Sequence, residues 1–493
     1  MRLPGRSEGR VSDPVVVGLI ALLVCGLHGF DGPLGHDQGA FVYGGERFAH
    51  GAPPYVGIFN SIGPLVDVAT GVGVRLGWAL GLDPVLAARL TYLVISALAA
   101  AVLSALAREA LRSRLAGWVA PAVLLTFESF TALASDGPRD KTLMLLLLEA
   151  ALLLLVRRQW LWAGALTALA TLTWQPVVLA AVTAAVVAAV TMAGSRVRGL
   201  TRYVAGGAVP TVLAGLLFLV SGHLRVAWWG FVLVNVGYTS QPNILQSWRL
   251  LTHAYDASLV LVVLGWLALL VLGALAASRL RRSPSPDGDR DLVALAAGGL
   301  VAGVWTCYAI NGGPDLFVVL PFAAIGVAAL TLRCVDSISS PARVRVATAV
   351  VVTALVAATV QSVSTRSNEL AGERASVDRV VAALPPGAVV LSIDVPEVPA
   401  LLQRRNPYPW QLFNSAMTPF LDDHLAGGLP GLAARISARH PELIAVGRVA
   451  TDSWLRHVLR TDYRPVGAGE YWTWYASRRL DSAVIRRVRL AVG

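Results

Sequence analysis

Three carboxylates follow the first long apolar segment of the chain: Asp31, Asp37 and Glu46. Ionisable groups beside a bilayer are costly unless they are solvated or paired, so they mark candidate functional positions. Asp37 is the strongest candidate, because a carboxylate there would be able to take a proton from the hydroxyl group of an acceptor. Two aromatic residues of the same segment, Tyr43 and Tyr55, are suited to forming the walls of a sugar site.

These acids also have a structural explanation. Asp31 and Asp37 would then only solvate or cap a surface loop. Glu46 is followed directly by Arg47, and this adjacency favours a structural ion pair over a chemical role.

A second polar cluster lies about a hundred residues further on, between two apolar segments. It contains two acids, Asp136 and Asp140, and two bases, Arg139 and Lys141. A guanidinium group is a planar fork that matches phosphate oxygens, and an ammonium group is a compact point charge. The cluster therefore predicts a phosphate site, and the alternative is a turn whose charges neutralise one another.

Composition determines what kind of element must position these groups. Of the 493 residues, 55% are hydrophobic and only 14% are charged, and the mean hydropathy is +0.62. Apolar runs of roughly 18 residues or more recur along the first three quarters of the chain, each long enough to cross a bilayer. We therefore predict a polytopic α-helical membrane protein of the plasma membrane, in contact with membrane lipid.

Arginine placement predicts the topology. The net charge of +11 comes almost wholly from arginines in short loops between apolar runs, as the positive-inside rule requires of cytoplasmic loops. Arg2, Arg6 and Arg10 precede the first apolar run, which we interpret as an uncleaved signal anchor with a cytoplasmic N-terminus. About eleven spanning helices follow from this reading: 14–30, 85–107, 116–134, 142–156, two within 160–193 hinged near 174–176, 203–221, 256–277, 292–310, one ending at Arg333, and 346–362.

Two segments are not read as spans. Residues 63–82 are only moderately apolar and rich in glycine, and they are predicted to form a helix at the membrane surface within an outer loop, 31–84. Residues 363–493 alternate strand-like runs with helical runs, which predicts a small α/β domain outside the cytoplasm. The predicted strands are 388–393, 443–446 and 471–475. The predicted division is therefore a membrane domain, 1–362, and an extracytoplasmic domain, 363–493.

Several functions have little support. The three cysteines are far apart and show neither a disulfide framework nor zinc-ligand spacing. The arginines are explained by topology, so no nucleic-acid partner is expected. No metal site is predicted and no cofactor is required, although the need for a divalent cation is left open.

The arrangement resembles the GT-C class of membrane glycosyltransferases, which includes protein O-mannosyltransferases and aminoarabinose transferases of lipid A. Three short motifs after the first apolar segment carry the resemblance: Asp37–Tyr43, Gly51–Tyr55 and Asn60–Pro64. Three later runs are also similar to the class: Arg139–Lys141 with the Leu-rich segment after it, Trp162–Pro176, and Asn311–Pro321.

The resemblance implies an inverting glycosyltransferase that moves a hexosyl or pentosyl group, such as mannose or arabinose, from a polyprenyl-phosphate donor to a hydroxyl acceptor on the outer face. The acceptor would be a glycan, a glycolipid or a protein, as in cell wall biogenesis. Asp37 would act as general base, and Arg139 and Lys141 would bind the leaving phosphate. Asp136, Asp140, Tyr43 and Tyr55 complete the expected binding site.

The sequence departs from the class at two points. Gln38 replaces a second acid, which questions a two-carboxylate mechanism, and Ser61–Gly63 replaces the usual lysine before Pro64. Lys141 or Arg249 is expected to supply the missing phosphate contact. Two other functions stay open: a transporter or flippase of lipid-linked sugars, and a non-catalytic scaffold of the cell envelope.

Overall fold

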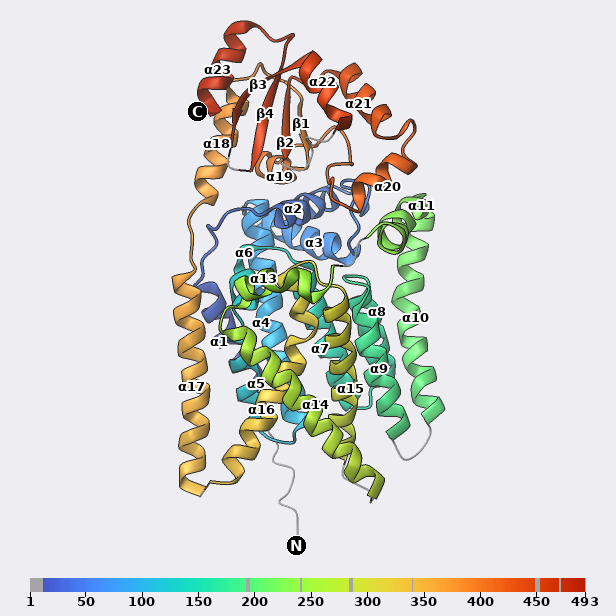
Figure 1. The fold of residues 1–493 in the computed structure, drawn as a ribbon, viewed down its shortest axis with the longest axis vertical. Helices are drawn as coiled ribbons and strands as arrows, with labels where there is room; N and C mark the ends of the chain where they lie inside the picture. Colours follow the sequence, from blue (N-terminus) through green and yellow to red (C-terminus); the bar gives the residue numbers. More distant parts are fainter. Residues whose placement is uncertain are drawn as a thin grey trace.

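The computed structural model describes residues 12–191, 196–239, 242–282, 287–338, 340–447, 453–469 and 471–492. Arg2, Arg6 and Arg10, on which the prediction of a signal anchor rests, lie outside these ranges. The described chain forms three layers: a bundle of long helices, a pair of helices lying across one end of the bundle, and a domain built on a β-sheet (Figure 1).

A helix or helix pair occupies each of the predicted apolar segments. Their bounds are α1 (Ser12–Gly26), α4 (Pro84–Ala110), α5 (Ala116–Leu125), α6 (Glu128–Asp136), α7 (Asp140–Val156), α8 (Trp160–Thr171), α9 (Val177–Thr191), α10 (Arg196–Val220), α14 (Ser258–Arg282), α15 (Asp287–Tyr308), α16 (Leu320–Asp336) and α17 (Ser340–Ser364). Within the described residues, five helices are long and apolar enough to cross a membrane, or six if one bent pair counts as a span. A multi-pass membrane protein follows, whereas the count of eleven spans is not confirmed.

The bent pair corrects one predicted helix. Residues 116–134 were expected to be continuous, but α5 and α6 meet at 72°. Phe127 is extended between them, so carbonyl groups near the break lose their helical partners. Two threonine hydroxyls compensate: Thr126 donates to the carbonyl of Val123 at 2.7 Å, and Thr131 to that of Leu125 at 2.6 Å.

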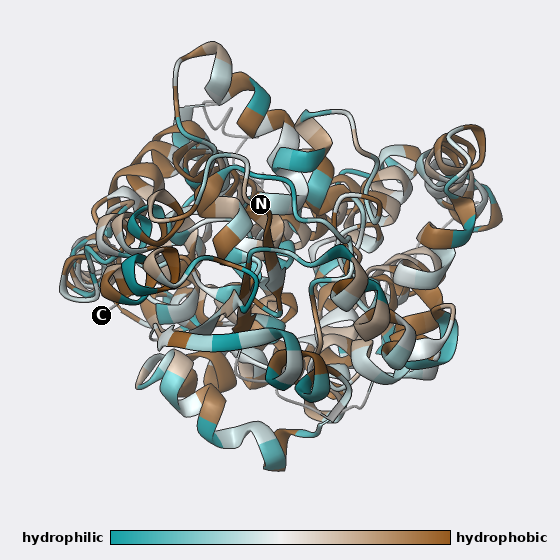
Figure 2. Cartoon of the chain, turned by 90° about the horizontal axis from the view of Figure 1, so that it is seen from above, coloured by the Kyte–Doolittle hydropathy of each residue, from teal (hydrophilic) through white to brown (hydrophobic). Residues whose placement is uncertain are grey.

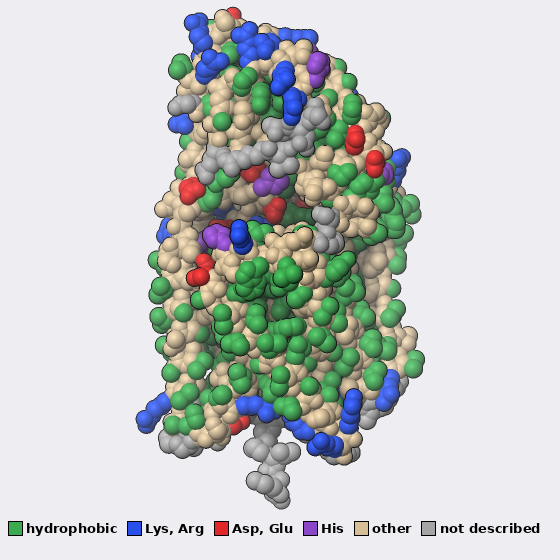
Figure 3. Space-filling model, viewed as in Figure 1, with side chains coloured by type: hydrophobic (Ala, Val, Ile, Leu, Met, Phe, Trp, Pro, Cys, Tyr) green, Lys and Arg blue, Asp and Glu red, His purple; other side chains and the backbone are tan. Residues whose placement is uncertain are grey.

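The outer faces of the bundle are apolar. Large hydrophobic side chains are exposed along α10, α14 and α17, among them Val212, Leu264 and Val356. Seen from above, hydrophobic turns are prominent on the peripheral helices (Figure 2). On the face drawn in Figure 3, hydrophobic side chains cover the bundle and basic side chains gather at its end far from the sheet domain. This distribution is the one expected of a bundle whose outer faces contact lipid.

The crosswise pair comprises α2 (His36–Ala49) and α3 (Leu65–Ala79). The two helices approach closely because glycines face the contact: a Cβ atom added to Gly45 would lie 2.4 Å from the Thr70 side chain. α3 covers most of the segment predicted to lie at the membrane surface, and its orientation across the bundle agrees with that prediction (Figure 1). The pair separates the bundle from the sheet domain.

Short helices complete the same end of the bundle. They are α11 (Leu224–Trp228), the π-helix η1 (Trp229–Leu233), α12 (Val234–Gly237), α13 (Ile244–Tyr255) and the 3-10 helix η2 (Gly313–Val318). An Asn243 capping box starts α13.

The sheet domain contains four strands in the order β1-β2-β4-β3. β1 (Val390–Ile393) is parallel to β2 (Leu443–Gly447), and β4 (Trp472–Ser477) is antiparallel to both β2 and β3 (Tyr463–Ala468). Its helices are α18 (Leu370–Ala382), α19 (Glu397–Leu402), α20 (Met417–His424), α21 (Gly428–Arg439), α22 (Ser453–Asp462) and α23 (Ser482–Val492). Three of the strands were predicted and β3 was not.

The sheet domain and α2 share one hydrophobic core. Val42 and Tyr43 of α2 belong to the same buried cluster as Val398 and Leu401 of α19. The backbone N–H of Asn406 also donates to the Tyr43 hydroxyl at 2.8 Å. The domain is therefore packed against the helix whose first turn carries Asp37.

Candidate active site

The centre of the site is an ion pair between two predicted residues. Arg139 Nη1 lies 2.5 Å from Asp37 Oδ2, although the residues are 102 positions apart. Asp37 is in the first turn of α2 and Arg139 is the N-cap residue of α7. Two helix N-termini therefore converge here, and their orphan N–H groups favour the binding of an anion.

His36 connects this ion pair to the sheet domain. Its Nδ1 lies 3.7 Å from Asp37 Oδ1, and its Nε2 lies 3.5 Å from Asp394 Oδ1. Asp394 follows β1 and is held by two backbone hydrogen bonds: its carboxylate accepts from Phe413 at 3.0 Å, and its own N–H donates to Gln411. Asp394 was not predicted, because only the fold brings the end of β1 to the start of α2.

Neighbouring charges shift the pKa values of Asp37 and His36. Desolvation raises the pKa of Asp37, but the hydrogen bond from His36 and the charge of Arg139 outweigh it, and the pKa lies well below its usual range. Desolvation lowers the pKa of His36, but hydrogen bonds to Asp37 and Asp394 raise it to about 10. The resting site therefore holds a carboxylate anion between two cations.

Lys141 lies in the first turn of α7 and is held by two acids. Its Nζ is 2.7 Å from Asp140 Oδ2 and 3.3 Å from Asp315 Oδ1. Asp315 in turn accepts the backbone N–H of Asn311 at 2.7 Å. Asp315 therefore helps to position the single lysine of the chain.

Asp136 is placed beside the loop that leads to Asp37. Its Oδ1 lies 3.3 Å from Nε2 of His28, and a Cβ atom added to Gly32 would lie 2.9 Å from the same oxygen.

Arg89 of α4 holds the loop that leads to Asp37. Its side chain is fully buried and donates to the carbonyls of Phe30, Gly32 and Pro33 at 2.5, 2.8 and 3.0 Å. Arg89 was missed because its partners are backbone atoms, which leave no sequence signal.

We expect Arg89→Met to destabilise the protein by about 3 kcal/mol or more, because three buried carbonyls lose a charged donor. A thermal-shift measurement on the purified protein would show a lower midpoint. Arg75→Gln is the matched control, since exposed Arg75 makes one hydrogen bond to a backbone carbonyl, that of Ala49. Equal midpoints for the two variants would contradict a bracing role for Arg89.

Glu397 borders the group from the first turn of α19. It is only 5% exposed, and its Oε2 has no hydrogen-bond partner among the described residues. Desolvation raises its pKa to about 7, while the charge of His36 lowers it and Asp394 raises it further. The folded state therefore favours the protonated form of Glu397 more than the unfolded chain does.

A pH dependence follows from this raised pKa. The stabilisation from the protonated form is complete below the unfolded pKa, near 4.5, and is lost as the pH rises through about 7. We expect thermal midpoints to fall between these pH values for the wild type and to fall less for Glu397→Gln. Glu369→Gln, at an exposed acid beside α18, should retain the wild-type profile. Identical profiles for all three proteins would exclude Glu397 as the titrating group.

Three predicted residues lie outside this cluster of charged side chains: Tyr43, Tyr55 and Arg249. Tyr43 is completely buried against the sheet domain, and Tyr55 is 2% exposed and donates to the carbonyl of Ile62 at 2.7 Å. Both rings are enclosed by protein, and their expected contact with a sugar stays a prediction. Arg249 is exposed on α13, which packs beside η2, and its role stays a prediction.

Part of the site is exposed at the surface. Figure 3 shows the molecule hollowed between the sheet domain and the bundle, with acidic and histidine side chains in the hollow. Asp37 itself is 55% exposed, and Arg139 is 18% exposed. Among the described residues, no group of three or more His, Cys, Asp or Glu side chains is arranged to hold a metal ion. The exposed carboxylate of Asp37 and the guanidinium group of Arg139 are suited to acid–base chemistry and to binding an anion.

Three solved structures are similar to this chain over nearly all of its length. ArnT from Cupriavidus metallidurans bound to undecaprenyl phosphate matches with a TM-score of 0.62 and 15% identity, covering 97% of this chain and 99% of that one. Arabinofuranosyltransferase AftD from Mycobacteria matches at 0.52 and 16%, covering 95% of this chain and 40% of AftD. The Archaeoglobus fulgidus oligosaccharyltransferase matches at 0.51 and 12%, covering 94% and 73%. No protein-family model and no curated protein sequence matches the chain.

Proposed function

We propose that this chain, which has the fold of the GT-C membrane glycosyltransferases, transfers a sugar from a polyprenyl-phosphate donor to a hydroxyl acceptor with inversion at the anomeric carbon. The observation that carries the proposal is the ion pair between Asp37 and Arg139, which unites a general base with a phosphate-binding group. The undecaprenyl phosphate bound to the similar ArnT structure supports a polyprenyl lipid as the donor. The basic end of the bundle supports a site that faces away from the cytoplasm.

In the proposed reaction the acceptor oxygen attacks the anomeric carbon and its proton passes to the Asp37 carboxylate. The bond between that carbon and the phosphate oxygen breaks on the opposite face, and polyprenyl phosphate leaves with the electron pair. Arg139 and Lys141 would stabilise the charge that develops on the phosphate. Asp140 and Asp315 position Lys141 for this contact.

The ion pair also supports an order of binding. The contact between Arg139 and Asp37 helps to keep the pKa of the carboxyl low and the base weak. A donor phosphate would compete with Asp37 for the guanidinium group. Donor binding would therefore free the carboxylate and raise its basicity when the acceptor hydroxyl arrives.

The proposal is tested by sugar transfer with purified protein in lipid. Radiolabelled polyprenyl-phosphate sugars would be supplied with an acceptor extract from membranes, and both labelled product and released polyprenyl phosphate would be measured. Time-dependent labelling with equimolar release of polyprenyl phosphate is expected. Movement of intact donor across the bilayer without release of polyprenyl phosphate would instead establish a transporter. The absence of both activities would favour a scaffold.

A further inference from the structure

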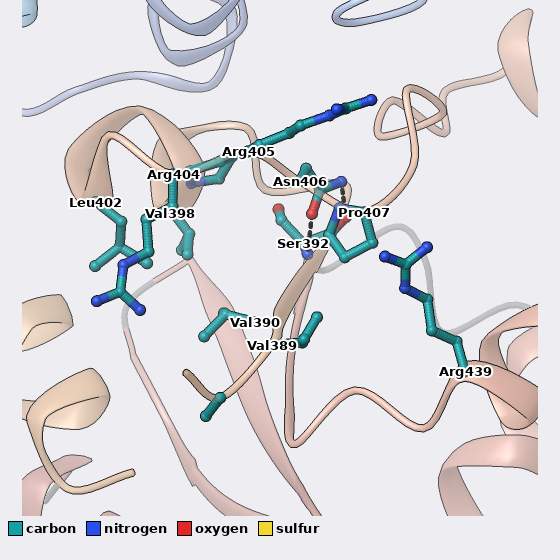
Figure 4. A pocket seen from close by; sticks show the side chains of 12 residues that line it. Val389, Val390, Ser392, Val398, Leu402, Arg404, Arg405, Asn406, Pro407 and Arg439 are labelled. Carbon is teal, nitrogen blue, oxygen red and sulfur yellow. Dashed lines mark hydrogen bonds between the residues drawn. The ribbon is translucent and has the colours of Figure 1, made fainter. Parts of the chain in front are cut away.

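A cavity of about 370 Å³ lies on the open edge of the sheet, outside the site described above. Its floor is β1, at the edge of the strand order, and its rim includes three arginines: Arg404, Arg405 and Arg439. In Figure 4 the guanidinium groups of Arg404 and Arg439 lie on opposite sides of the pocket, with Val389 and Val390 between them. We name this feature the arginine pocket.

The arginine pocket carries a concentrated positive charge. All three arginines are exposed, and the described residues provide no carboxylate partner for any of them. Arg439 instead lies over the ring of Tyr408, at 5.8 Å from its centroid. Three guanidinium groups around one cavity repel one another, so an anion bound between them is stabilised.

The shape of the arginine pocket is fixed by the protein. The side chain of buried Asn406 accepts a hydrogen bond from the N–H of Ser392 at 2.8 Å and donates one to the Ser392 carbonyl at 3.1 Å. These bonds hold the loop that carries Arg404 and Arg405 against β1. The backbone N–H of Asn406 is bound to Tyr43 of α2. The two neighbouring arginines are therefore presented from a rigid base rather than from a free loop.

A second cavity continues the basic surface towards α2. It measures about 210 Å³ and shares Arg405, Asn406 and Pro407 with the arginine pocket, and it adds Arg47 and His50. Arg47 is in the last turn of α2, whereas Asp37 is in the first. A helix rises about 1.5 Å per residue, so the two side chains start roughly 15 Å apart. A ligand that occupies both cavities and reaches Asp37 must be an extended chain.

We propose that the arginine pocket binds acidic groups of a polyanionic glycan, which serves as the acceptor for the transfer proposed above. Several guanidinium groups that face one cavity from different sides select a ligand with repeated charges, and carboxylate or phosphate groups fit the fork of an arginine. The floor of valine side chains accepts the apolar face of a sugar ring. This inference rests on the proposed function and names the class of its acceptor.

The test is direct binding to the full chain in nanodiscs, measured by calorimetry with defined probes. An oligogalacturonate supplies carboxylates, a phosphate-bearing mannan oligosaccharide supplies phosphates, and a malto-oligosaccharide of the same length is neutral. We expect at least one acidic probe to bind, the neutral probe not to bind, and added salt to weaken the acidic probe. The double variant Arg404→Gln/Arg405→Gln should weaken binding by about tenfold or more.

Two controls make the result decisive. Arg486→Gln/Arg487→Gln removes the same charge from exposed positions of α23 and should retain wild-type affinity. Asp37→Asn should also retain it, so a failure of transfer can be told apart from a failure of acceptor binding. Equal binding of acidic and neutral probes would overturn the proposal. It would also be overturned by equal losses in the two double variants, or by binding only to phosphatidylglycerol vesicles, which would assign the arginines to lipid headgroups.

Discussion

Asp37→Asn is expected to lower the rate of sugar transfer by about a thousandfold, within the range that general-base catalysis contributes. Asparagine has nearly the same size as aspartate, but it cannot take the proton of the acceptor hydroxyl. It also removes the ion pair with Arg139, so the guanidinium group becomes free to bind the donor. We therefore expect kcat to fall while the KM for the donor stays equal or decreases, measured with purified protein in lipid.

The matched control for this variant is Asp31→Asn. Asp31 lies in the same outer loop and its side chain is exposed, so the same chemical change should alter the rate by less than about threefold. Folding is checked by monodispersity and by the thermal midpoint of each protein. If Asp37→Asn transferred sugar at the rate of wild type, Asp37 would be a structural residue and the base would lie elsewhere.

Arg139→Gln is expected to reduce kcat/KM for the donor by about a hundredfold or more, because one charge-assisted contact to the leaving phosphate is lost. The variant also removes one of the two cations beside Asp37, while His36 remains, so the depressed pKa of this carboxyl should rise. Rates measured against donor concentration and against pH separate these effects. The KM for the donor should rise, and the acid limb of the profile should move to higher pH.

Two further variants test the geometry of this contact. Arg139→Lys keeps the charge but lacks the planar fork, and an intermediate loss is expected. Arg157→Gln changes the other end of α7, where Arg157 forms a largely exposed ion pair with Glu109, and should have little effect. Equal decreases in kcat/KM for Arg139→Gln and Arg157→Gln would indicate that the basic residues at the ends of α7 stabilise the fold rather than bind the donor.

The helical framework was largely predictable, because hydropathy is a local property of the chain. Each apolar segment identified from composition contains a helix, and the hinge near residues 174–176 separates α8 from α9. The break between α5 and α6 was not predictable in the same way. Leu125 and Thr126 read as part of one apolar run, and the bend depends on side chains that satisfy carbonyls in three dimensions.

In the sheet domain, too, the sequence predicted some elements and not others. β1, β2 and β4 consist of short apolar runs that local patterns detect, whereas β3 contains Arg464, Pro465 and Gly467, which weaken any strand signal. β3 pairs with β4 through a register shift at Pro465 and Gly467, so its existence depends on the partner strand. The boundary between the predicted domains stays a prediction, although α17 ends at Ser364 and α18 begins at Leu370.

By itself the sequence determined which residue types are available for chemistry, and it identified both Asp37 and Arg139 because charged groups are rare in an apolar chain. Only the tertiary structure decided that these two form an ion pair, that Asp394 reaches them through His36, and that Tyr43 and Tyr55 are enclosed by protein. The physical reason is the range of each effect. Hydrophobicity and charge act residue by residue, whereas an active site depends on distances between helix ends that are set by the packing of the whole bundle.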